Sequence, residues 1–274
     1  MDTNITTLPD LNDFKAISDT QKAQFAESGH ILIPGILNAD EVAAYRKVIV
    51  EAAEKFNSEK RKLADRDTYG KAFLQIMNLW QDDERVKKFV LAKRFAKIAA
   101  DLLGVENVRL YHDQALFKEP GGGPTPWHQD QNYWPLDTNK TITMWMPLVD
   151  IPDLDMGMLT FASGSQSKGN IFDHVISDES EDAFDNYVKE NGFAISRPSS
   201  MKAGDATWHH GFTIHNAPAN KSDKMREVMT IIYFADGATI SAPKHKWQEA
   251  DHQKWLMGKP VGGPADSALN PAIL

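Results

Sequence analysis

The second half of the chain, from Val108 onward, is a series of short apolar segments, each about as long as a β-strand. Clusters of Gly, Pro, Asp and Ser separate the segments, and such clusters are typical of turns between strands. Many short strands joined in this way favour a β-barrel or a double-stranded β-helix, in which each strand buries one face. We therefore expect a mainly β core of the jelly-roll, cupin-like type over residues 106–236, with flanking helices.

The first part of the chain has helical rather than strand periodicity. Ser18 can cap a first helix that Gly29 ends, and Asn38 with Glu41 resembles the capping box of a second. The segment 83–103 also places its apolar residues on one helical face, which predicts a further helix. Because a chain of 274 residues can bury one full core, we expect a single domain. Its three parts are a helical layer at residues 18–105, the β core at 106–236 and a partly helical tail at 237–274.

The charge and composition exclude several kinds of protein. Lys and Arg number 30 against 38 Asp and Glu, and the resulting net charge of −8 argues against binding to nucleic acid or anionic membranes. No apolar run approaches the ~20 residues that span a bilayer, and the N-terminus lacks the features of a signal peptide, so we expect a cytoplasmic protein. A monomer or a homodimer is expected. Because the chain has no cysteine, any metal must be held by histidine and carboxylate ligands.

The triplet His-Gln-Asp at residues 128–130 stands where a strand is expected. Side chains two apart on a strand point to the same side, so His128 and Asp130 can face one point. His215, in a later strand-like segment, is the candidate for a third ligand. Two histidines with one carboxylate form the facial triad that holds Fe(II) and leaves positions open.

Arg226 follows His215 by eleven residues, at the start of the apolar run REVMTIIYF. Its planar guanidinium suits two-point capture of a carboxylate. A metal triad with a buried arginine nearby predicts iron together with a dicarboxylate cosubstrate. The order of these residues along successive strands fits one sheet closed on itself.

Aromatic and amide residues follow Asp130, a composition suited to binding a polar organic molecule near a metal. His209 and His210 offer a rival metal pair, but neighbours on a strand face opposite ways and cannot both reach one ion. We keep His210 as a candidate for substrate contact. The candidates for contact with a small-molecule substrate are therefore Asn132, Tyr133, Trp134 and His210.

Together these segments resemble the phytanoyl-CoA dioxygenase-like branch of the Fe(II)/2-oxoglutarate oxygenases. The resemblance rests on WHQD at residues 127–130, on MWMPLVDI, on GMLTFASGSQ at 157–166 and on GHILIPGIL at 29–37, with His215 and Arg226 closing the pattern. It covers residues 20–236. It implies a double-stranded β-helix fold and, as cofactors, Fe(II), the cosubstrate 2-oxoglutarate and O2.

The resemblance also implies roles for single residues. His128, Asp130 and His215 would bind the iron, and Arg226 would pair with the distal carboxylate of 2-oxoglutarate. The other positions that it places at the cosubstrate are Trp145, Gln114 and Gln75, the last where some relatives carry Lys. The implied reaction is hydroxylation of an unactivated C–H bond of a small-molecule metabolite, with release of succinate and CO2. An intact Asp130 argues against halogenation, while desaturation, ring formation and epimerisation stay open.

Other functions stay open at this point. A metal-dependent hydrolase or isomerase on a cupin-like barrel could use the same ligands with Zn(II), although it has no evident need for Arg226. A non-catalytic barrel could bind a small ligand, although it has no chemical reason to keep all three metal ligands. The acidic insertion at residues 167–200 is either a solvated loop with a helix or a lid over the site. In the tail, Trp247 and Trp255 are expected to serve packing or an oligomer contact.

Overall fold

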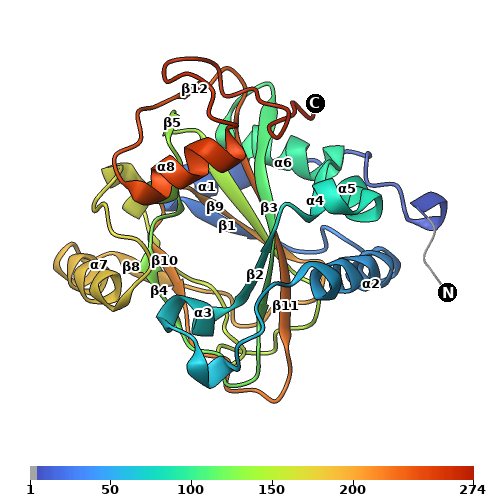
Figure 1. The fold of residues 1–274 in the computed structure, drawn as a ribbon, viewed down its shortest axis with the longest axis horizontal. Helices are drawn as coiled ribbons and strands as arrows, with labels where there is room; N and C mark the ends of the chain where they lie inside the picture. The colour runs from blue at the N-terminus through green and yellow to red at the C-terminus, as the bar shows by residue number, and fades with distance from the viewer. Residues whose placement is uncertain (1–4) are drawn as a thin grey trace.

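In the computed structural model, which describes residues 5–274, two antiparallel β-sheets face each other and helices lie outside them (Figure 1). Within this range the larger sheet has six strands, in the spatial order β1 (His30–Ile33), β9 (Ala206–His210), β6 (Thr141–Pro147), β11 (Arg226–Ala235), β3 (Val108–Lys118) and β2 (Leu74–Met77). The smaller sheet has the order β4 (Thr125–His128), β10 (His215–Ala217), β7 (Thr160–Ser163) and β8 (Ala194–Ser196). A short pair joins β5 (Leu136–Asp137) to β12 (Thr239–Ile240). The jelly-roll, cupin-like fold is confirmed, but the expected single closed sheet is wrong, because the described strands form separate sheets.

The alternation of side chains along β11 shows that one face of the larger sheet packs in the core and the other lines a cavity. Met229 and Ile231 point into the core beneath the helices, whereas Thr230 and Ile232 line a cavity between the sheets. The strand is buried along its whole length, which explains its nearly continuous apolar sequence. Arg226, at the start of the strand, falls on the cavity side with Thr230 and Ile232.

Several of the helices that precede β3 cover the outer face of the larger sheet (Figure 1). The capping predictions are confirmed: Ser18 and the left-handed Gly29 bound the first helix, and Asn38 with Glu41 forms the capping box of the second. The bounds of these helices are α1 Asp19–Ser28, α2 Ala39–Phe56, α3 Thr68–Ala72, α4 Leu79–Asp82, α5 Glu84–Val90 and α6 Lys93–Leu103, with 3-10 turns at Ile5–Thr7 and Leu63–Asp65.

The helix expected at residues 83–103 is in fact two helices. Helix α5 ends at Val90, Ala92 has an extended backbone, and α6 follows. The N–H of Arg94 donates to the carbonyl of Leu11 at 3.0 Å. The N-terminal segment thus supplies the hydrogen-bond acceptor that the preceding turn would supply in a continuous helix. The spacing of the apolar residues predicted the buried face of both helices. It could not show that the N-terminal segment packs at the break between them.

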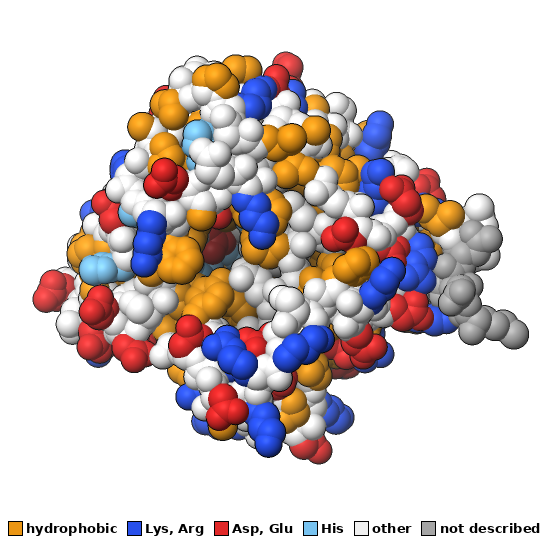
Figure 2. All heavy atoms as spheres, in the orientation of Figure 1, with side chains coloured by type: hydrophobic (Ala, Val, Ile, Leu, Met, Phe, Trp, Pro, Cys, Tyr) orange, Lys and Arg blue, Asp and Glu red, His pale blue; other side chains and the backbone are white. Residues whose placement is uncertain are grey.

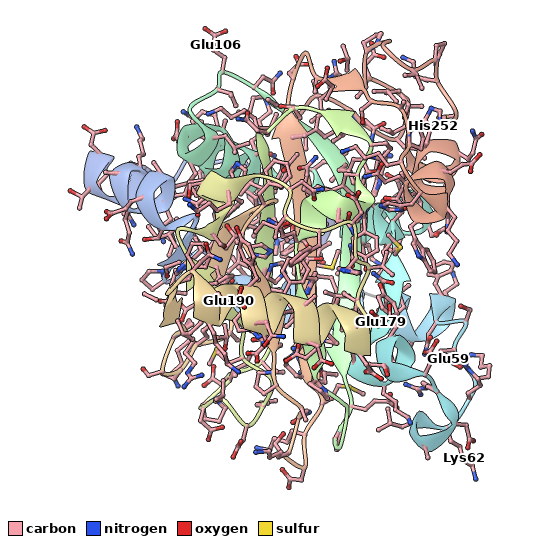
Figure 3. The ribbon with its side chains drawn as sticks, turned by 90° about the vertical axis from the view of Figure 1, so that its left-hand side faces the viewer. Glu59, Lys62, Glu106, Glu179, Glu190 and His252 are labelled. Carbon is pink, nitrogen blue, oxygen red and sulfur yellow. The ribbon has the colours of Figure 1, made fainter. Side chains whose placement is uncertain are left out.

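The insertion at residues 167–200 contains helix α7 (Asp178–Glu190), which follows a 3-10 turn at Ser165–Lys168. In Figure 3 the labelled Glu179 and Glu190 mark the two ends of α7 as it lies across the smaller sheet. Phe184 and Val188 of this helix are buried in one cluster with Trp127. The insertion therefore covers the outer face of the smaller sheet.

The tail folds into helix α8 (Lys246–Trp255), which lies over the end of the two sheets near the β5–β12 pair (Figure 1). Trp255 and Leu256 share a buried cluster with Tyr111 and Ile232. The expected helical tail is thus present, and it is attached to the β core. Among residues 5–274 no helix is both long enough and apolar enough to cross a membrane.

Candidate active site

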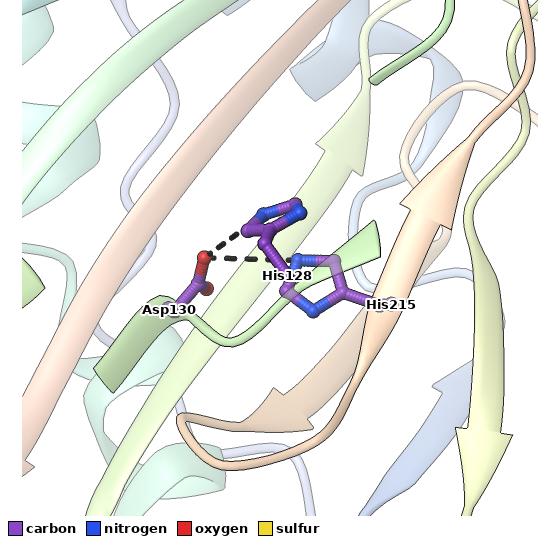
Figure 4. Close-up of side chains that lie close together, drawn as sticks. All are labelled: His128, Asp130 and His215. Atoms are coloured by element: carbon purple, nitrogen blue, oxygen red, sulfur yellow. Dashed lines mark ion pairs between the residues drawn. The ribbon is translucent and has the colours of Figure 1, made fainter. Parts of the chain in front are cut away.

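Three side chains that the sequence analysis selected as metal ligands meet between the sheets (Figure 4). His128 ends β4 and His215 begins β10, and the two are register partners in the smaller sheet. Asp130 begins a 3-10 turn, Asp130–Tyr133, so it lies just beyond the strand on which it was expected. Its Oδ1 is 3.5 Å from Nε2 of His128 and 3.6 Å from Nε2 of His215. The three ligand atoms lie within 4.8 Å of one another, a spacing that suits a shared metal ion.

Backbone carbonyls fix the orientation of both histidine rings. Nδ1 of His128 lies 2.8 Å from the carbonyl oxygen of Pro126, and Nδ1 of His215 lies 2.9 Å from that of Thr213. A carbonyl can only accept a hydrogen bond, so each Nδ1 carries the proton. The lone pair of each ring is then on Nε2, which faces Asp130 and the proposed metal position.

The second oxygen of the Asp130 carboxylate is held by two side chains of the larger sheet. Thr143 Oγ1 donates to Oδ2 at 2.8 Å, and Nε2 of His209 lies 3.1 Å from the same oxygen. These contacts leave Oδ1 facing the two ligand histidines. His209 was not selected from the sequence as a site residue, whereas its neighbour His210 was; the alternation of β9 places His209 at the site.

The protonation states of Asp130 and His215 suit the binding of a divalent cation. Burial by itself would raise the pKa of Asp130, but His215, His128 and His209 lower it well below its usual range. Burial, followed by the nearby His128 and His209, lowers the pKa of His215 well below its usual value. At neutral pH the site therefore offers a carboxylate and a neutral imidazole. This nitrogen and oxygen donor set fits Fe(II).

A second group of residues lies at the Arg226 end of the cavity. Arg226 and Lys118 are paired directly across β11 and β3, and both side chains are buried. Nη1 of Arg226 donates to the carbonyl of Gly157 at 2.8 Å, its Nε has no hydrogen-bond partner, and its Cζ lies 5.3 Å from the ring centre of Trp145. Lys118 donates to the carbonyl of Gly123 and to Thr125.

These two cations have no acidic partner among the residues that the structure describes. Burial lowers the pKa of Arg226 to about 9, and burial followed by the charge of Arg226 lowers the pKa of Lys118 to about 6. Burial and repulsion between like charges disfavour the charged form of Lys118, and a buried charge such as that of Arg226 is normally paired. A bound carboxylate would reach the unpartnered Nε of Arg226 and supply the missing negative charge. The pocket therefore fits the distal carboxylate of 2-oxoglutarate.

A cavity of about 530 Å³ is lined by the three proposed metal ligands and by Arg226 and Trp145, whereas Lys118 is buried behind this wall and is not among the described lining residues. The cavity reaches from Arg226 and Trp145 past the three proposed metal ligands to the side chains of α8. Figure 2 shows a hollow on this face, with hydrophobic side chains around it and acidic and histidine side chains inside. One cavity can thus hold a metal, a dicarboxylate and an organic substrate together.

The two glutamines that the resemblance placed at the cosubstrate both line this cavity. Nε2 of Gln75 donates to Oε1 of Gln114 at 2.8 Å, and Oε1 of Gln75 accepts from the hydroxyl of Tyr69 at 2.8 Å. Their amides therefore bind each other across β2 and β3. Contact with the cosubstrate stays a prediction for both residues.

The four candidates for substrate contact lie in different places. Tyr133 and Trp134 line the cavity. Asn132 and His210 are not among its described lining residues: Asn132 donates to the carbonyl of His174 at 2.7 Å, and His210 accepts from the N–H of Phe212 at 3.1 Å. Their positions do not support substrate contact.

Several lining residues were not selected from the sequence. Trp247 and Trp255 of α8, for which packing or an oligomer contact was expected, form part of the cavity wall together with Asp251. Val175 and Ile176 of the insertion also line the cavity, and the N–H of Ile176 donates to the hydroxyl of Tyr133 at 2.8 Å. The loop before α7 is therefore part of the wall.

Comparison with known proteins agrees with this geometry. The model of the phytanoyl-CoA dioxygenase (PhyH) family matches residues 25–228. A probable alpha-ketoglutarate-dependent hypophosphite dioxygenase of Stutzerimonas stutzeri is 24% identical over 240 residues, which are 80% of this chain and 79% of that protein.

Solved structures show the same fold. The alpha-ketoglutarate-dependent carbocyclase SnoK from nogalamycin biosynthesis matches with a TM-score of 0.78 and 25% identity, over 94% of this chain and 97% of that one. The epimerase SnoN, in a complex with Fe3+, alpha-ketoglutarate and nogalamycin RO, matches with a TM-score of 0.75 and 24% identity, over 92% and 97% of the chains. The chain belongs to the phytanoyl-CoA dioxygenase family and is an Fe(II)- and 2-oxoglutarate-dependent dioxygenase.

Proposed function

We propose that this dioxygenase hydroxylates a C–H bond of a small organic molecule that binds at the α8 end of the cavity. One oxygen atom of O2 enters the product as a hydroxyl group, and the other enters succinate as 2-oxoglutarate loses CO2. The observation that carries the proposal is the presence, in one cavity, of a two-histidine, one-carboxylate donor set and of the buried Arg226, which has no acidic partner among the described residues.

Each group of residues has a separate task in this proposal. His128, Asp130 and His215 would hold Fe(II), and the iron, when bound, would supply the activation of O2. Arg226 would hold the distal carboxylate of 2-oxoglutarate, which sets how far the cosubstrate enters the cavity, and Lys118, paired with Arg226 across the two strands, would add positive charge nearby.

The remaining wall positions the substrate and keeps water out. Tyr133 and Trp134 come three and four residues after the proposed ligand Asp130 and line the same cavity, so an organic molecule packed against them would lie close to the metal. An intact Asp130 leaves no place for a halide ligand, which supports hydroxylation over halogenation. Every residue in the proposal comes from one chain, so we expect activity from a monomer and a homodimer alike.

The test is an anaerobic titration of the metal-free protein with Fe(II) and then 2-oxoglutarate, followed by the visible charge-transfer absorption of the iron chelate. We expect this absorption in the wild type, and we expect Arg226→Ala to need far more 2-oxoglutarate. Arg46→Ala is the matched control, because Arg46 pairs at 2.6 Å with Glu227, the neighbour of Arg226 on the opposite face of β11.

The control should titrate like the wild type. Iron binding without the absorption, or an equal loss in both variants, would overturn the assignment of the cosubstrate site. Oxygen-dependent release of succinate and a product heavier by one oxygen atom would then establish hydroxylation. A product that has lost two hydrogen atoms would show desaturation or ring formation instead.

A further inference from the structure

The α8 end of the cavity has an unusual combination of aromatic and acidic side chains. Five of its lining residues have large aromatic rings: Tyr69, Tyr133, Trp134, Trp247 and Trp255. Two acidic side chains, Asp67 and Asp251, line the same region. Apart from Arg226 at the cosubstrate end, Lys254 is the one Lys or Arg among the described lining residues. This region is therefore aromatic with an excess of negative charge.

Asp251 is the acidic group most suited to meet a ligand. Its Oδ2 accepts from the hydroxyl of Tyr111 at 3.0 Å, and no ion pair forms with a described residue. Asp67, by comparison, is exposed and uses Oδ1 to cap α3 through the N–H of Gly70. Burial raises the pKa of Asp251 to about 7, although the hydrogen bond from Tyr111 and the charge of Lys254 both lower it, so a further positive charge would stabilise the ionised carboxylate.

The position of Asp251 also relates it to the proposed metal site. Burial raises the pKa of Tyr69 to about 12, and the charges of Asp251 and Asp130 both contribute to the rise. The same two carboxylates raise the pKa of Tyr133, after burial. Each tyrosine hydroxyl thus lies within electrostatic range of both acids. Asp251, both tyrosines and Asp130 also line the same cavity, so a small molecule held at Asp251 would share this cavity with the proposed metal.

We propose that the α8 end of the cavity binds a substrate that carries a cationic amine, with the carboxylate of Asp251 as its counter-ion and aromatic faces around it. An ammonium group is attracted to the faces of tryptophan and tyrosine rings and to a carboxylate, and both attractions grow when water is excluded. The binding of the amine does not depend on the proposed hydroxylation. Only the position at which the substrate would react rests on that proposed function.

An anionic substrate suits this region less well. Phosphoryl and carboxylate groups are normally bound by arginine, lysine or backbone N–H groups. Here Lys254 is exposed, and its Nζ lies 4.3 Å from the ring centre of Trp255. The relative from Stutzerimonas stutzeri is named as a hypophosphite dioxygenase. In this region of the present cavity the hypophosphite anion would be repelled by Asp251 and Asp67 and attracted only by Lys254.

The test uses three probes of similar size that differ in charge: benzyltrimethylammonium, its neutral isostere neopentylbenzene, and benzylphosphonate. Binding is followed by the quenching of tryptophan fluorescence, because Trp134, Trp247 and Trp255 line the region. The measurement uses metal-free protein without 2-oxoglutarate, so its result does not depend on iron, cosubstrate or turnover.

We expect the cation to bind about 10- to 30-fold more tightly than the neutral isostere, and the phosphonate to bind most weakly. Asp251→Asn keeps an acceptor for the Tyr111 hydroxyl but removes the charge, and should abolish the preference for the cation. Glu249→Gln is the matched control, because Glu249 is an exposed acid of the same helix outside the cavity lining, and it should keep the preference.

Equal binding of the cation and the neutral isostere, tighter binding of the phosphonate, or an unchanged preference in Asp251→Asn would each overturn the inference. Such a result would leave the proposed oxygenase activity untouched, because the charge-transfer titration tests that activity separately. Conversely, a failed titration with an intact preference for the cation would show an amine-binding cavity without the proposed chemistry.

Discussion

Lys118 and Arg226 lie directly opposite each other on β3 and β11, and both are buried without an acidic partner among the described residues. Burial and the nearby Arg226 disfavour the protonated form of Lys118, so near neutral pH the empty site holds the buried charge of Arg226 without a counter-ion. An anion that binds beside Arg226 would supply the missing counter-ion and stabilise the site. The same arrangement predicts that binding of 2-oxoglutarate depends on pH in a particular direction.

The affinity for 2-oxoglutarate should fall as the pH rises above about 6. Lys118 has a pKa of about 6, lowered by burial and then by Arg226, and a bound carboxylate would raise this pKa because it favours the charged form. Between the two pKa values, binding takes up a proton, so each pH unit weakens binding by up to about tenfold. Calorimetric titration with Mn(II) in place of Fe(II), in two buffers of different ionisation enthalpy, measures both the affinity and the proton uptake.

Lys118→Met provides the control for this prediction. The variant should bind 2-oxoglutarate more weakly at pH 6.5, on the order of the loss of one charge-assisted hydrogen bond, and should show little proton uptake. If the wild type and the variant have the same pH dependence, Lys118 does not titrate on binding.

Gly157→Ala should weaken the binding of 2-oxoglutarate. A Cβ at this position would lie 3.0 Å from Cδ of Lys118 and 3.2 Å from Nη1 of Arg226, so it would displace both side chains. The backbone also has a positive φ of +77°, which adds about 1–2 kcal/mol of strain for an alanine.

Gly121→Ala separates the two effects, because Gly121 has a φ of +75° and no atom within 4 Å of the added Cβ. Both variants should lose similar stability in a urea titration, but only Gly157→Ala should lose affinity for 2-oxoglutarate. Equal affinity in the two variants would show that the contacts of Gly157 do not position the cation pair.

His209→Ala should lower the affinity for Fe(II) by about 10- to 100-fold, the usual cost of losing a side chain that orients a metal ligand. Nε2 of His209 lies 3.1 Å from Oδ2 of Asp130, and without it the carboxylate can rotate more freely. His210→Ala is the control on the same strand. His210 does not line the cavity, so the control should bind Fe(II) like the wild type in a competition with a chelator of known affinity.

The sequence predicted those parts of the site that depend on short-range regularities. The capping residues need only neighbouring positions, and they identified the ends of α1 and the start of α2. The spacing of His128 and Asp130 brought them together even though Asp130 lies in a 3-10 turn. Two residues this close in the sequence can face the same point whether the backbone is a strand or a turn.

The parts that the sequence did not predict depend on contacts between distant segments. The pairing of Lys118 with Arg226 follows from the register of β3 with β11, which no local pattern reveals. The role of Asp251 follows from the docking of α8 onto the β core. His209 was overlooked because alternation shows that it and His210 differ in direction, but not which of them faces the metal ligands.

Arg94→Leu should destabilise the protein by about 3–5 kcal/mol, because it leaves a buried carboxylate without its partner. Arg94 and Glu41 are both buried and joined by hydrogen bonds of 2.9 and 3.0 Å, and Arg94 also donates to the carbonyl of Ile36 at 3.0 Å. Adding Glu41→Gln should restore part of the stability, since glutamine removes the unpaired charge and still offers an acceptor to the N–H of Asn38. The free energy of unfolding in urea measures both effects. A loss below about 1 kcal/mol in the single variant, or no recovery in the double variant, would show that this ion pair does not hold α6 to α2.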